Sequence, residues 1–478
     1  MSTGKRSLGE SPIRCVIALA GTGSSPLNYG MNRHFQISRR SFMTRCAALA
    51  AAGGLPLWFV ERELAAQEAP KSPRSPNDRP GIALIGCGGM GRGDAQNASR
   101  FGDIVAVCDV DDNHASEAAK QFTKNGRTPA RFSDFRRALE RGDVDIAVQA
   151  TPDHWHTLVN LAATRAKKDV YGEKPMTLTI DEGKHLIKAV REHRTVFQTG
   201  TQQRSDKKFR LACELVRNGR IGKLKQVQVF VPAGLREGPF KTVPVPPGLN
   251  WDFWQGQTPG VDYLKERCHA NFRWWWEYSG GPVTDWGAHH NDIACWGIGQ
   301  DGPTGVEARA LTEPIPGGYT TPSEFEATLT WANGVTQSVR TTPDDTPYGG
   351  VIRKDGQRNG VKFVGTDGWI WVNRADLGAS KDDILETPLP ANAVRLEVSN
   401  DHMGNFFDCV RTRKTPVAPV EVGHRSAAIG HLIVIALRTG RKYQWDPARE
   451  EFIGENAQEG NAHLARPMRP PYNWGFVS

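Results

Sequence analysis

Cysteine is scarce in this chain of 478 residues, which contains only eight. Two lie before residue 47, and the other six are scattered between residues 87 and 409 with no paired spacing. Closely paired cysteines are what mark disulfide-rich scaffolds and cysteine metal sites. The sequence therefore predicts neither a disulfide framework nor a cysteine-based metal centre.

Strong charge of one sign is also missing once the N-terminus is set aside. The formal net charge is +8, but residues 1–66 hold eight Lys or Arg and three Asp or Glu, which leaves +3 for the rest. A charge this small gives no basis for nucleic-acid binding. After residue 66 we expect no apolar run long enough to span a membrane, for which about 20 residues are needed.

The N-terminal region has the pattern of a twin-arginine export signal. Residues 38–43 read SRRSFM, an Ala-rich apolar run follows over residues 46–60, and Ala65-Ala66 is a small-residue cleavage candidate. The alternative is a chance Arg-Arg pair before an amphipathic helix. We predict a signal over residues 1–66, with Met31 as the true start, and export to the periplasm through the twin-arginine translocon.

The most informative stretch covers residues 81–111. An apolar run is followed by glycines spaced as G-x-G-x-x-G, a helix-like segment and a second apolar run that ends at Asp109. This context is typical of dinucleotide binding, with an acid placed for the ribose hydroxyls. The alternative is a Gly-rich turn in another α/β protein. Asp109 favours NAD over NADP because it would repel a 2′-phosphate.

Each glycine of the motif has its own predicted role. Gly86 permits the tight turn, Gly88 lets the backbone approach a pyrophosphate, and Gly91 lets the helix pack close to the strand. The helix N-terminus that follows offers N–H groups and a positive dipole to phosphate. Arg92 and Arg100 lie nearby, so NADP stays an alternative cofactor.

Strand-like and helix-like segments alternate up to residue 218. Strands are predicted at 82–85, 104–108, 144–150, 169–171 and 195–200, and helices at 113–124, 133–141, 154–166, 180–193 and 205–218, with Asn113 and Ser133 as N-caps. This alternation predicts a doubly wound parallel sheet. We place an α/β Rossmann domain at residues 81–202, after a disordered linker at 67–80.

The periodicity changes near Lys223. Alternating runs predict strands at 223–231, 324–331, 334–340, 360–364 and 369–372, and two helices are expected at 402–413 and 422–439. These elements predict a second, α+β domain with an antiparallel sheet over residues 203–450. Residues 451–478 are expected to form a C-terminal extension.

Four motifs together resemble the Gfo/Idh/MocA family, the group of glucose–fructose oxidoreductase and inositol dehydrogenase. They are GCGGMG at 86–91, ATPDHWH at 150–156, GEKP at 172–175 and GGPVTDWGAHHND at 280–292. The resemblance implies a Rossmann domain joined to a large open-faced, mainly antiparallel sheet domain, with the active site between them. It also implies NAD(P)-dependent chemistry on a sugar or polyol, and we expect a homo-oligomer through the open sheet face.

Hydride transfer from an alcohol requires a base for the hydroxyl proton and a group that stabilises the developing alkoxide. Lys174, at a strand end, is the predicted cation, and the family places this lysine in the catalytic centre. His289 is the predicted base, oriented by Asp285 one helical turn earlier, and the resemblance supports both positions. The alternatives are a surface lysine, a capping aspartate and a core histidine.

Further predicted cofactor contacts lie at strand ends or in the glycine turn: Met90, Thr151, Pro152, His156 and Glu173. Arg204, Trp286 and Asp292 are predicted to face the substrate. Asp285, His289, His290 and Asp292 together could suggest a metal site, but hydride transfer needs none, so no metal is predicted. Seven of the fourteen tryptophans fall between residues 251 and 296, and most are expected in the core, with one or two lining the pocket.

Three functions fit these observations. The favoured one is an exported NAD-dependent oxidoreductase acting on a secondary alcohol of a sugar, polyol or glycoside, which could keep its cofactor bound. The second is an NAD-dependent glycoside-cleaving enzyme that works by transient oxidation and elimination, as some members of the family do. The third is a noncatalytic sugar- or nucleotide-binding protein.

Overall fold

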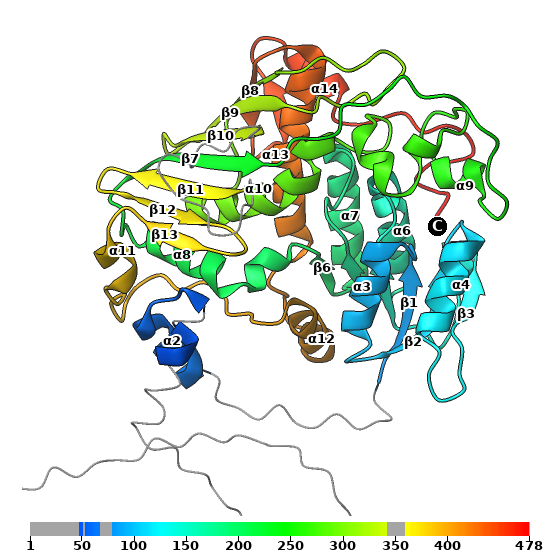
Figure 1. The fold of residues 1–478 in the computed structure, drawn as a ribbon, viewed down its shortest axis with the longest axis horizontal. Helices are drawn as coiled ribbons and strands as arrows, with labels where there is room; N and C mark the ends of the chain where they lie inside the picture. The colour runs from blue at the N-terminus through cyan, green and yellow to red at the C-terminus, as the bar shows by residue number, and fades with distance from the viewer. Residues whose placement is uncertain (1–46, 51–52, 67–78, 342–358, 478) are drawn as a thin grey trace, which may run out of the picture.

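The computed structural model describes residues 47–50, 53–66, 79–341 and 359–477. The twin-arginine pattern and almost all of the predicted linker lie outside these residues. Two sheets organise the described chain, one of six strands and one of nine. They stand side by side, with the long helix α13 (Val420–Thr439) behind the junction between them (Figure 1).

The six-stranded sheet is the predicted Rossmann domain. Its strands are β1 (Gly81–Ile85), β2 (Asp103–Cys108), β3 (Ala130–Phe132), β4 (Ile146–Gln149), β5 (Asp169–Gly172) and β6 (Phe197–Thr199). Their order is β3-β2-β1-β4-β5-β6 and every pair is parallel. Connecting helices are α3 (Gly89–Ala98), α4 (Asp112–Gln121), α5 (Phe135–Leu139), α6 (Asp153–Arg165) and α7 (Ile180–His193). The doubly wound fold class is confirmed.

Helices α4 and α5 are each capped by an aspartate and not by the residue that was predicted to cap them. Asp111, not Asn113, caps α4, since its carboxylate accepts from the Asn113 amide at 2.9 Å. Asp134, not Ser133, caps α5. A carboxylate near a helix N-terminus also interacts favourably with the helix dipole, which favours aspartate at these positions.

The nine-stranded sheet forms the second domain. Its order is β13-β12-β11-β7-β10-β9-β8-β14-β15, and only the β7–β10 pair is parallel. The strands are β7 (Leu224–Val231), β8 (Gly305–Ala310), β9 (Phe325–Thr330), β10 (Thr336–Thr341), β11 (Gly360–Gly365), β12 (Trp369–Val372), β13 (Leu377–Ala379), β14 (Tyr443–Asp446) and β15 (Glu451–Ile453). Strand β15 lies past the predicted domain end at residue 450, so the sheet reaches into the predicted extension.

One face of this sheet is covered by α8 (Lys207–Arg217), α10 (Asp285–Ile298) and α13. Val227 and Val229 of β7 belong to the same buried cluster as Leu211 and Ile293 of the helices. Gln226 and Gln228 alternate with these valines and are partly exposed. The alternation gives the sheet one covered apolar face and one polar face, as in the open-faced domain that was predicted.

Helix α13 corrects one expectation. By length and composition alone it could cross a membrane, although we expected no such run after residue 66. In the structure 78% of its apolar window is buried inside the protein. It packs against α7, α10 and β8, so it is the core helix that joins the two domains.

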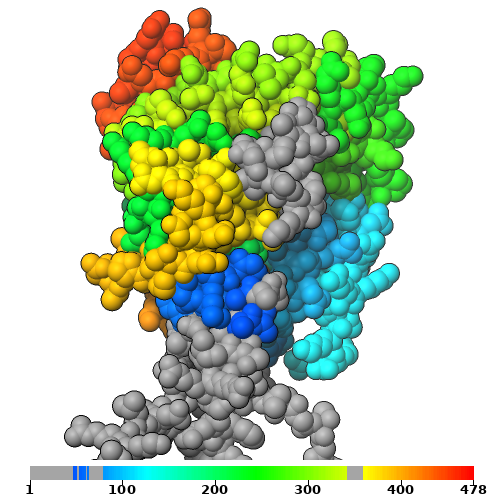
Figure 2. Space-filling view, turned by 60° about the vertical axis from the view of Figure 1, so that its left-hand side comes forward, coloured from blue at the N-terminus to red at the C-terminus, as the bar shows by residue number. Residues whose placement is uncertain are grey.

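Short elements complete the described chain. Between β6 and α10 lie η2 (Gln202–Ser205), α9 (Trp251–Gln255), η3 (Lys265–Arg267), η4 (His269–Trp274) and η5 (Gly281–Val283), and after β13 lie α11 (Asp382–Glu386), α12 (His402–Thr412) and α14 (Ala457–Ala462). Before β1, helix α2 (Leu57–Ala66) sits against the second domain near α8 and α11 (Figures 1 and 2). This helix falls within the region predicted to be an export signal.

Candidate active site

A cavity of about 440 Å³ lies at the carboxyl ends of the Rossmann strands, where the second domain meets them. Nearly all of the predicted cofactor residues line it: Gly86, Gly88, Met90, Asp109, Thr151, Pro152, His156, Glu173 and Lys174. Gly91 does not. A Cβ there would lie 1.9 Å from the Gly86 carbonyl oxygen, so Gly91 permits the close helix–strand packing expected of it.

The first two glycines also behave as their predicted roles require. Gly86 has a φ of +90°, and a Cβ there would lie 2.5 Å from the Ala150 carbonyl oxygen. A Cβ on Gly88 would meet no atom within 4 Å, so it would project into open space. Gly88 immediately precedes α3 and no side chain caps that helix. A pyrophosphate can therefore approach the first turn of α3.

Asp109 is held rigidly at the end of β2. Its two carboxylate oxygens accept from the backbone amides of Cys87 at 2.7 Å and Asp111 at 2.9 Å. The imidazole of His114 lies 3.6 Å away. Interaction with the Asp109 carboxylate, which accepts from the imidazole, raises the pKa of His114. The carboxylate thus stands at the cavity wall where ribose hydroxyls are bound in this fold.

The roof of the cavity comes from the second domain. We call residues 232–280 the aromatic loop, because its buried members, among them Trp251, Trp254 and Tyr278, form a cluster of their own. The loop pairs with the turn after β2, where the Asn250 amide donates to the Val110 carbonyl at 2.9 Å. Trp254 lines the cavity, in keeping with the expectation that few tryptophans would do so.

The C-terminal tail holds this roof in place. Arg469 donates from Nε to the Gly256 carbonyl at 2.6 Å and from Nη2 to the Asp252 carbonyl at 2.7 Å. Tyr472 belongs to the Rossmann core cluster and packs edge-on against Trp155. We call this arrangement the clasp, since it fastens the aromatic loop to the Rossmann domain.

Lys174 enters the cavity directly after β5. Its Nζ donates to Oδ1 of Asp285 at 2.7 Å, and its side chain is only 8% exposed. Nε of Arg273 donates to the same oxygen at 3.2 Å. Burial raises the pKa of Asp285, but the two cations outweigh burial and leave the pKa below its usual value. Lys174 and Arg273 both line the cavity, which concentrates positive charge there.

His289 lies one turn after Asp285 on α10 and is buried. Burial, together with the charges of Lys174 and Arg374, holds its pKa well below the ordinary value. Among the described residues no hydrogen bond joins His289 to Asp285, whose carboxylate faces Lys174 and Arg273 instead. The predicted role of Asp285 in orienting His289 is therefore wrong, and Asp285 positions the lysine.

Glu173 contributes a second buried acid beside Lys174. Burial raises its pKa to about 6, although the neighbouring lysine acts in the opposite direction. Asp94 of α3 interacts with it, and burial and the charge of Glu173 raise the pKa of Asp94 well above its usual value. The charge of each carboxylate makes ionisation of the other less favourable, because like charges repel.

His156 braces the catalytic turn. Its Nδ1 faces the Pro175 carbonyl oxygen at 2.6 Å and its Nε2 faces the Thr151 carbonyl oxygen at 2.8 Å. Both partners are backbone acceptors, and burial lowers the pKa of the ring, so the neutral imidazole donates to one of them at a time. His156 fixes the segment that carries Lys174 against the end of β4.

Two of the predicted substrate residues are bound to each other instead. Arg204 donates to both carboxylate oxygens of Asp292 at 2.7–2.9 Å, and the Ser426 hydroxyl donates to Asp292 as well. The Asp292 side chain is 0% exposed. Neither residue can contact a substrate in this arrangement. The third, Trp286, lies under the Arg374 guanidinium at 4.8 Å and beside the His290 ring.

The structure adds two cations that the sequence analysis missed. Arg273 is the first residue of the RWWWEY segment at 273–278, which was noted only for its tryptophans. Its position as a cation among aromatic residues, shortly before the Gly-Gly pair, could have indicated a role in the site. Arg374 follows β12, where no motif marks it. His290, suspected as a metal ligand, instead faces the Asn359 side-chain oxygen at 3.0 Å.

Comparison with models of protein families shows which family the chain belongs to. The model described as "Oxidoreductase family, NAD-binding Rossmann fold" matches residues 81–201, and its C-terminal alpha/beta domain matches residues 230–321 and 357–474. The chain belongs to the Gfo/Idh/MocA oxidoreductase family. The predictions of this family and of an NAD-binding Rossmann domain are thereby confirmed.

Similar members of the family differ in the reactions that their names state. The chain is 23% identical to scyllo-inositol 2-dehydrogenase (NAD(+)) of Bacillus subtilis over 77% of its length and 96% of that protein. It is 35% identical to a glycosyl hydrolase family 109 protein of Shewanella sp. strain ANA-3, over 30% of this chain and 35% of that one. A levoglucosan dehydrogenase structure with NADH and L-sorbose aligns at 19% identity with a TM-score of 0.57, covering 77% and 98% of the two chains. The chain spans less than half the length of the first curated relatives it matches.

Proposed function

We propose that this Gfo/Idh/MocA protein transfers hydride between NAD and a secondary alcohol of a sugar, polyol or glycoside. The observation that carries the proposal is Lys174, which lines the cavity that begins at the dinucleotide motif and is fixed by Asp285 at 2.7 Å. Similarity to an inositol dehydrogenase and to a levoglucosan dehydrogenase supports a carbohydrate or polyol substrate.

The chain's own groups supply the acid–base and electrostatic parts of the reaction, while bound NAD supplies the hydride acceptor or donor. Lys174 stabilises the negative charge that develops on the substrate oxygen. Asp285, which also accepts a hydrogen bond from Arg273, keeps its ammonium in place. His289 is neutral because it is buried, so it can take the hydroxyl proton during oxidation and return it during reduction.

NAD is the proposed cofactor, with NADP disfavoured, because the carboxylate of Asp109 is held at the ribose end of the cavity. The roof and the clasp support tight retention of the nucleotide. A retained cofactor must be regenerated in place, so one substrate would be oxidised and a second reduced at the same site. Titration of nucleotide-free protein with NAD and NADP tests this, and a tenfold preference for NADP would contradict it.

A second candidate is glycoside cleavage through transient oxidation of a ring hydroxyl, loss of the neighbouring C–H proton, elimination of the aglycone and reduction of the ring. Similarity to a glycosyl hydrolase family 109 protein supports it. Both candidates use the same Lys174 site. They differ in whether NADH accumulates.

One experiment separates the candidates. The purified protein is denatured and the released nucleotide is identified, and then the intact protein is mixed with free sugars, polyols and 4-nitrophenyl glycosides. Net NADH formation indicates the dehydrogenase. Release of 4-nitrophenol without net NADH indicates the glycoside-cleaving enzyme. Absence of both activities, with a sugar or nucleotide bound, indicates the noncatalytic protein.

Export through the twin-arginine translocon to the periplasm is also part of the proposal, supported by the SRRSFM pattern. That pathway carries folded proteins, so the cofactor could be loaded before export. A homo-oligomer through the polar face of the nine-stranded sheet is proposed as the assembly. Replacing Arg39 and Arg40 with lysine should keep the precursor in the cytoplasm, and unchanged export would refute the signal.

A further inference from the structure

Helix α2 is inserted into the second domain by its apolar side. Phe59 is 0% exposed and belongs to the same core cluster as Phe209 and Leu215. The indole Nε1 of Trp58 donates to the Leu385 carbonyl at 2.8 Å. Leu57, on the same helix, is 39% exposed. Residues of one short helix thus divide into a buried side and an exposed side, as in any helix that belongs to a core.

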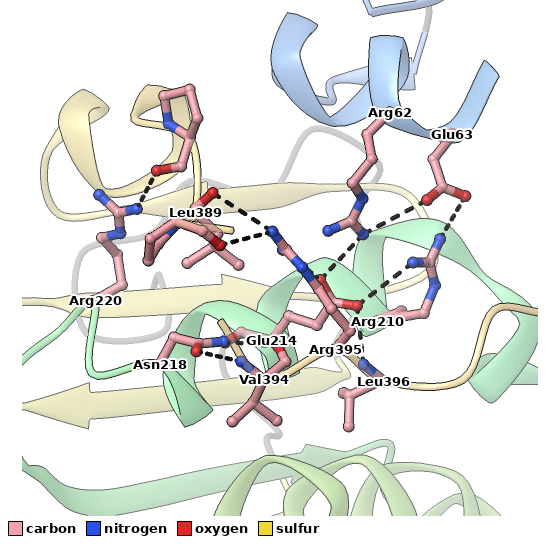
Figure 3. A network of polar contacts seen from close by, with 12 residues as sticks. Arg62, Glu63, Arg210, Glu214, Asn218, Arg220, Leu389, Val394, Arg395 and Leu396 are labelled. Atoms are coloured by element: carbon pink, nitrogen blue, oxygen red, sulfur yellow. Dashed lines mark hydrogen bonds and ion pairs between the residues drawn. The ribbon is translucent and has the colours of Figure 1, made fainter. Parts of the chain in front are cut away.

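Charged residues of α2 complete a buried ion network (Figure 3). Glu63 accepts from Nη2 of Arg210 at 2.7 Å, and their side chains are 2% and 0% exposed. Arg62 approaches Glu214, which is also 0% exposed, at 3.1 Å. The remaining contact of Arg210 with a carboxylate, that of Glu214, is longer at 3.6 Å.

This network depends on α2 being present. Without α2, the guanidinium of Arg210 loses its close carboxylate partner, Glu63, and keeps only the longer contact with Glu214. It also loses the Phe59 ring, which lies 5.1 Å from its central carbon. A buried charge that loses its partner is strongly destabilising. The second domain is therefore built to keep α2.

We propose that α2 is a permanent part of the folded protein and that removal of the export sequence stops before Leu57, not after Ala66. The inference rests on the proposed export. Ala65 and Ala66 lie in the last turn of α2, and a peptidase needs its substrate locally unfolded. Because the twin-arginine pathway carries folded proteins, α2 is already docked when a peptidase meets the precursor.

The first test uses the full chain with a C-terminal tag, expressed in a bacterium that has the twin-arginine pathway. The N-terminal peptide of the periplasmic protein is identified by mass spectrometry. We expect it to begin at or before Leu57. A mature protein that begins at Gln67 would overturn the inference. Protein found only in the cytoplasm would refute export instead, and the second test then decides whether α2 is permanent.

The second test needs no export. Phe59→Ala in the full chain should lower the unfolding midpoint by at least about 4 °C, because it empties a buried aromatic site. Leu57→Ala is the matched control on the same helix and should shift the midpoint by less than about 1 °C, as expected for an exposed residue. Glu63→Gln should fall between them. Equal midpoints for Phe59→Ala and Leu57→Ala would show that α2 is not part of the fold.

Discussion

Two ion pairs tie α10 to neighbouring strand ends of the Rossmann sheet, and they differ in what else can reach them. Lys174 follows β5 and pairs with Asp285, whose side chain is 17% exposed. Arg204 follows β6 and pairs with Asp292, whose side chain is 0% exposed. The two acids are seven residues apart, so they share a face of the helix about 10 Å from each other.

The contrast shows how an ion pair that can contact a ligand differs from one that only stabilises the fold. Asp292 receives three hydrogen bonds from Arg204 and one from Ser426, and its side chain is 0% exposed, so a ligand cannot reach the carboxylate. Lys174 has one carboxylate partner and lines the cavity. Both pairs join a cation at a strand end to an aspartate of α10. Hydrogen-bond saturation and access to the cavity distinguish them.

Breaking the buried Arg204–Asp292 pair should have the largest effect, and this effect should be a loss of stability. Arg204→Met leaves the buried Asp292 carboxylate without its cation, so we expect the free energy of unfolding to drop by about 3–5 kcal/mol. Denaturant unfolding measures this. Turnover per folded, cofactor-loaded molecule should stay near normal. A loss of turnover without a loss of stability would show that Arg204 contributes to the active site after all.

Breaking the Lys174–Asp285 pair, which lies at the cavity, should lower turnover instead of stability. Lys174→Met should lower turnover by about 100- to 1,000-fold, through lost stabilisation of the oxyanion. His289→Ala should also cost at least about 100-fold. The two losses should not multiply in the double variant if the residues act as a unit. Steady-state turnover on the identified substrate, with nucleotide content as the control, checks this, and near-normal turnover of His289→Ala would show that another residue is the base.

Asp285→Asn should have a smaller effect on turnover, about tenfold, because the ammonium of Lys174 loses a charge-assisted hydrogen bond but remains in the cavity. Arg273→Lys is a useful companion, since it keeps the charge and changes only the geometry. NAD content should be unchanged in both variants. A loss as large as that of Lys174→Met would mean that Asp285 takes part in the chemistry directly.

The buried His290 of α10 should make the stability of the protein depend on pH. Burial lowers the pKa of His290 to about 3, so below the unfolded value of about 6.5 only the unfolded chain takes up its proton. Stability should therefore fall as the pH drops from 6.5 towards 3, by up to about 1.4 kcal/mol per pH unit for this residue. Denaturant unfolding of His290→Gln at pH 7 and pH 5 should show a shallower dependence, and an unchanged slope would contradict the assignment.

The sequence was sufficient where a local signal decided the structure. Helix α7 was predicted with its observed bounds, because Thr179 caps it and its apolar residues recur at helical spacing. The glycine motif and the strand-end motifs predicted residues that nearly all line the cavity. Strands β14 and β15, of four and three residues, were missed because runs that short show no periodicity.

The candidate site was predicted less fully, because tertiary contacts decided its partners. The i, i+4 spacing of Asp285 and His289 suggested a pair, yet Asp285 binds Lys174 and Arg273 from other segments. Arg204 and Asp292 are 88 residues apart, and no local pattern foretells that they meet. Spacing along one helix proposes contacts, and the packing of distant segments selects among them.

The clasp by Arg469 has a consequence for biosynthesis. The Rossmann residues leave the ribosome first, whereas Arg469, which fastens the roof of the cavity, is made about 270 residues later. At about 5–20 residues per second, some 270 residues of further synthesis take roughly 10–50 s. During that interval a growing chain has a nucleotide cradle that is open to the cytoplasm. Emergence of Arg469 then lets the roof close, so the direction of translation allows the cofactor to enter before the cavity is enclosed.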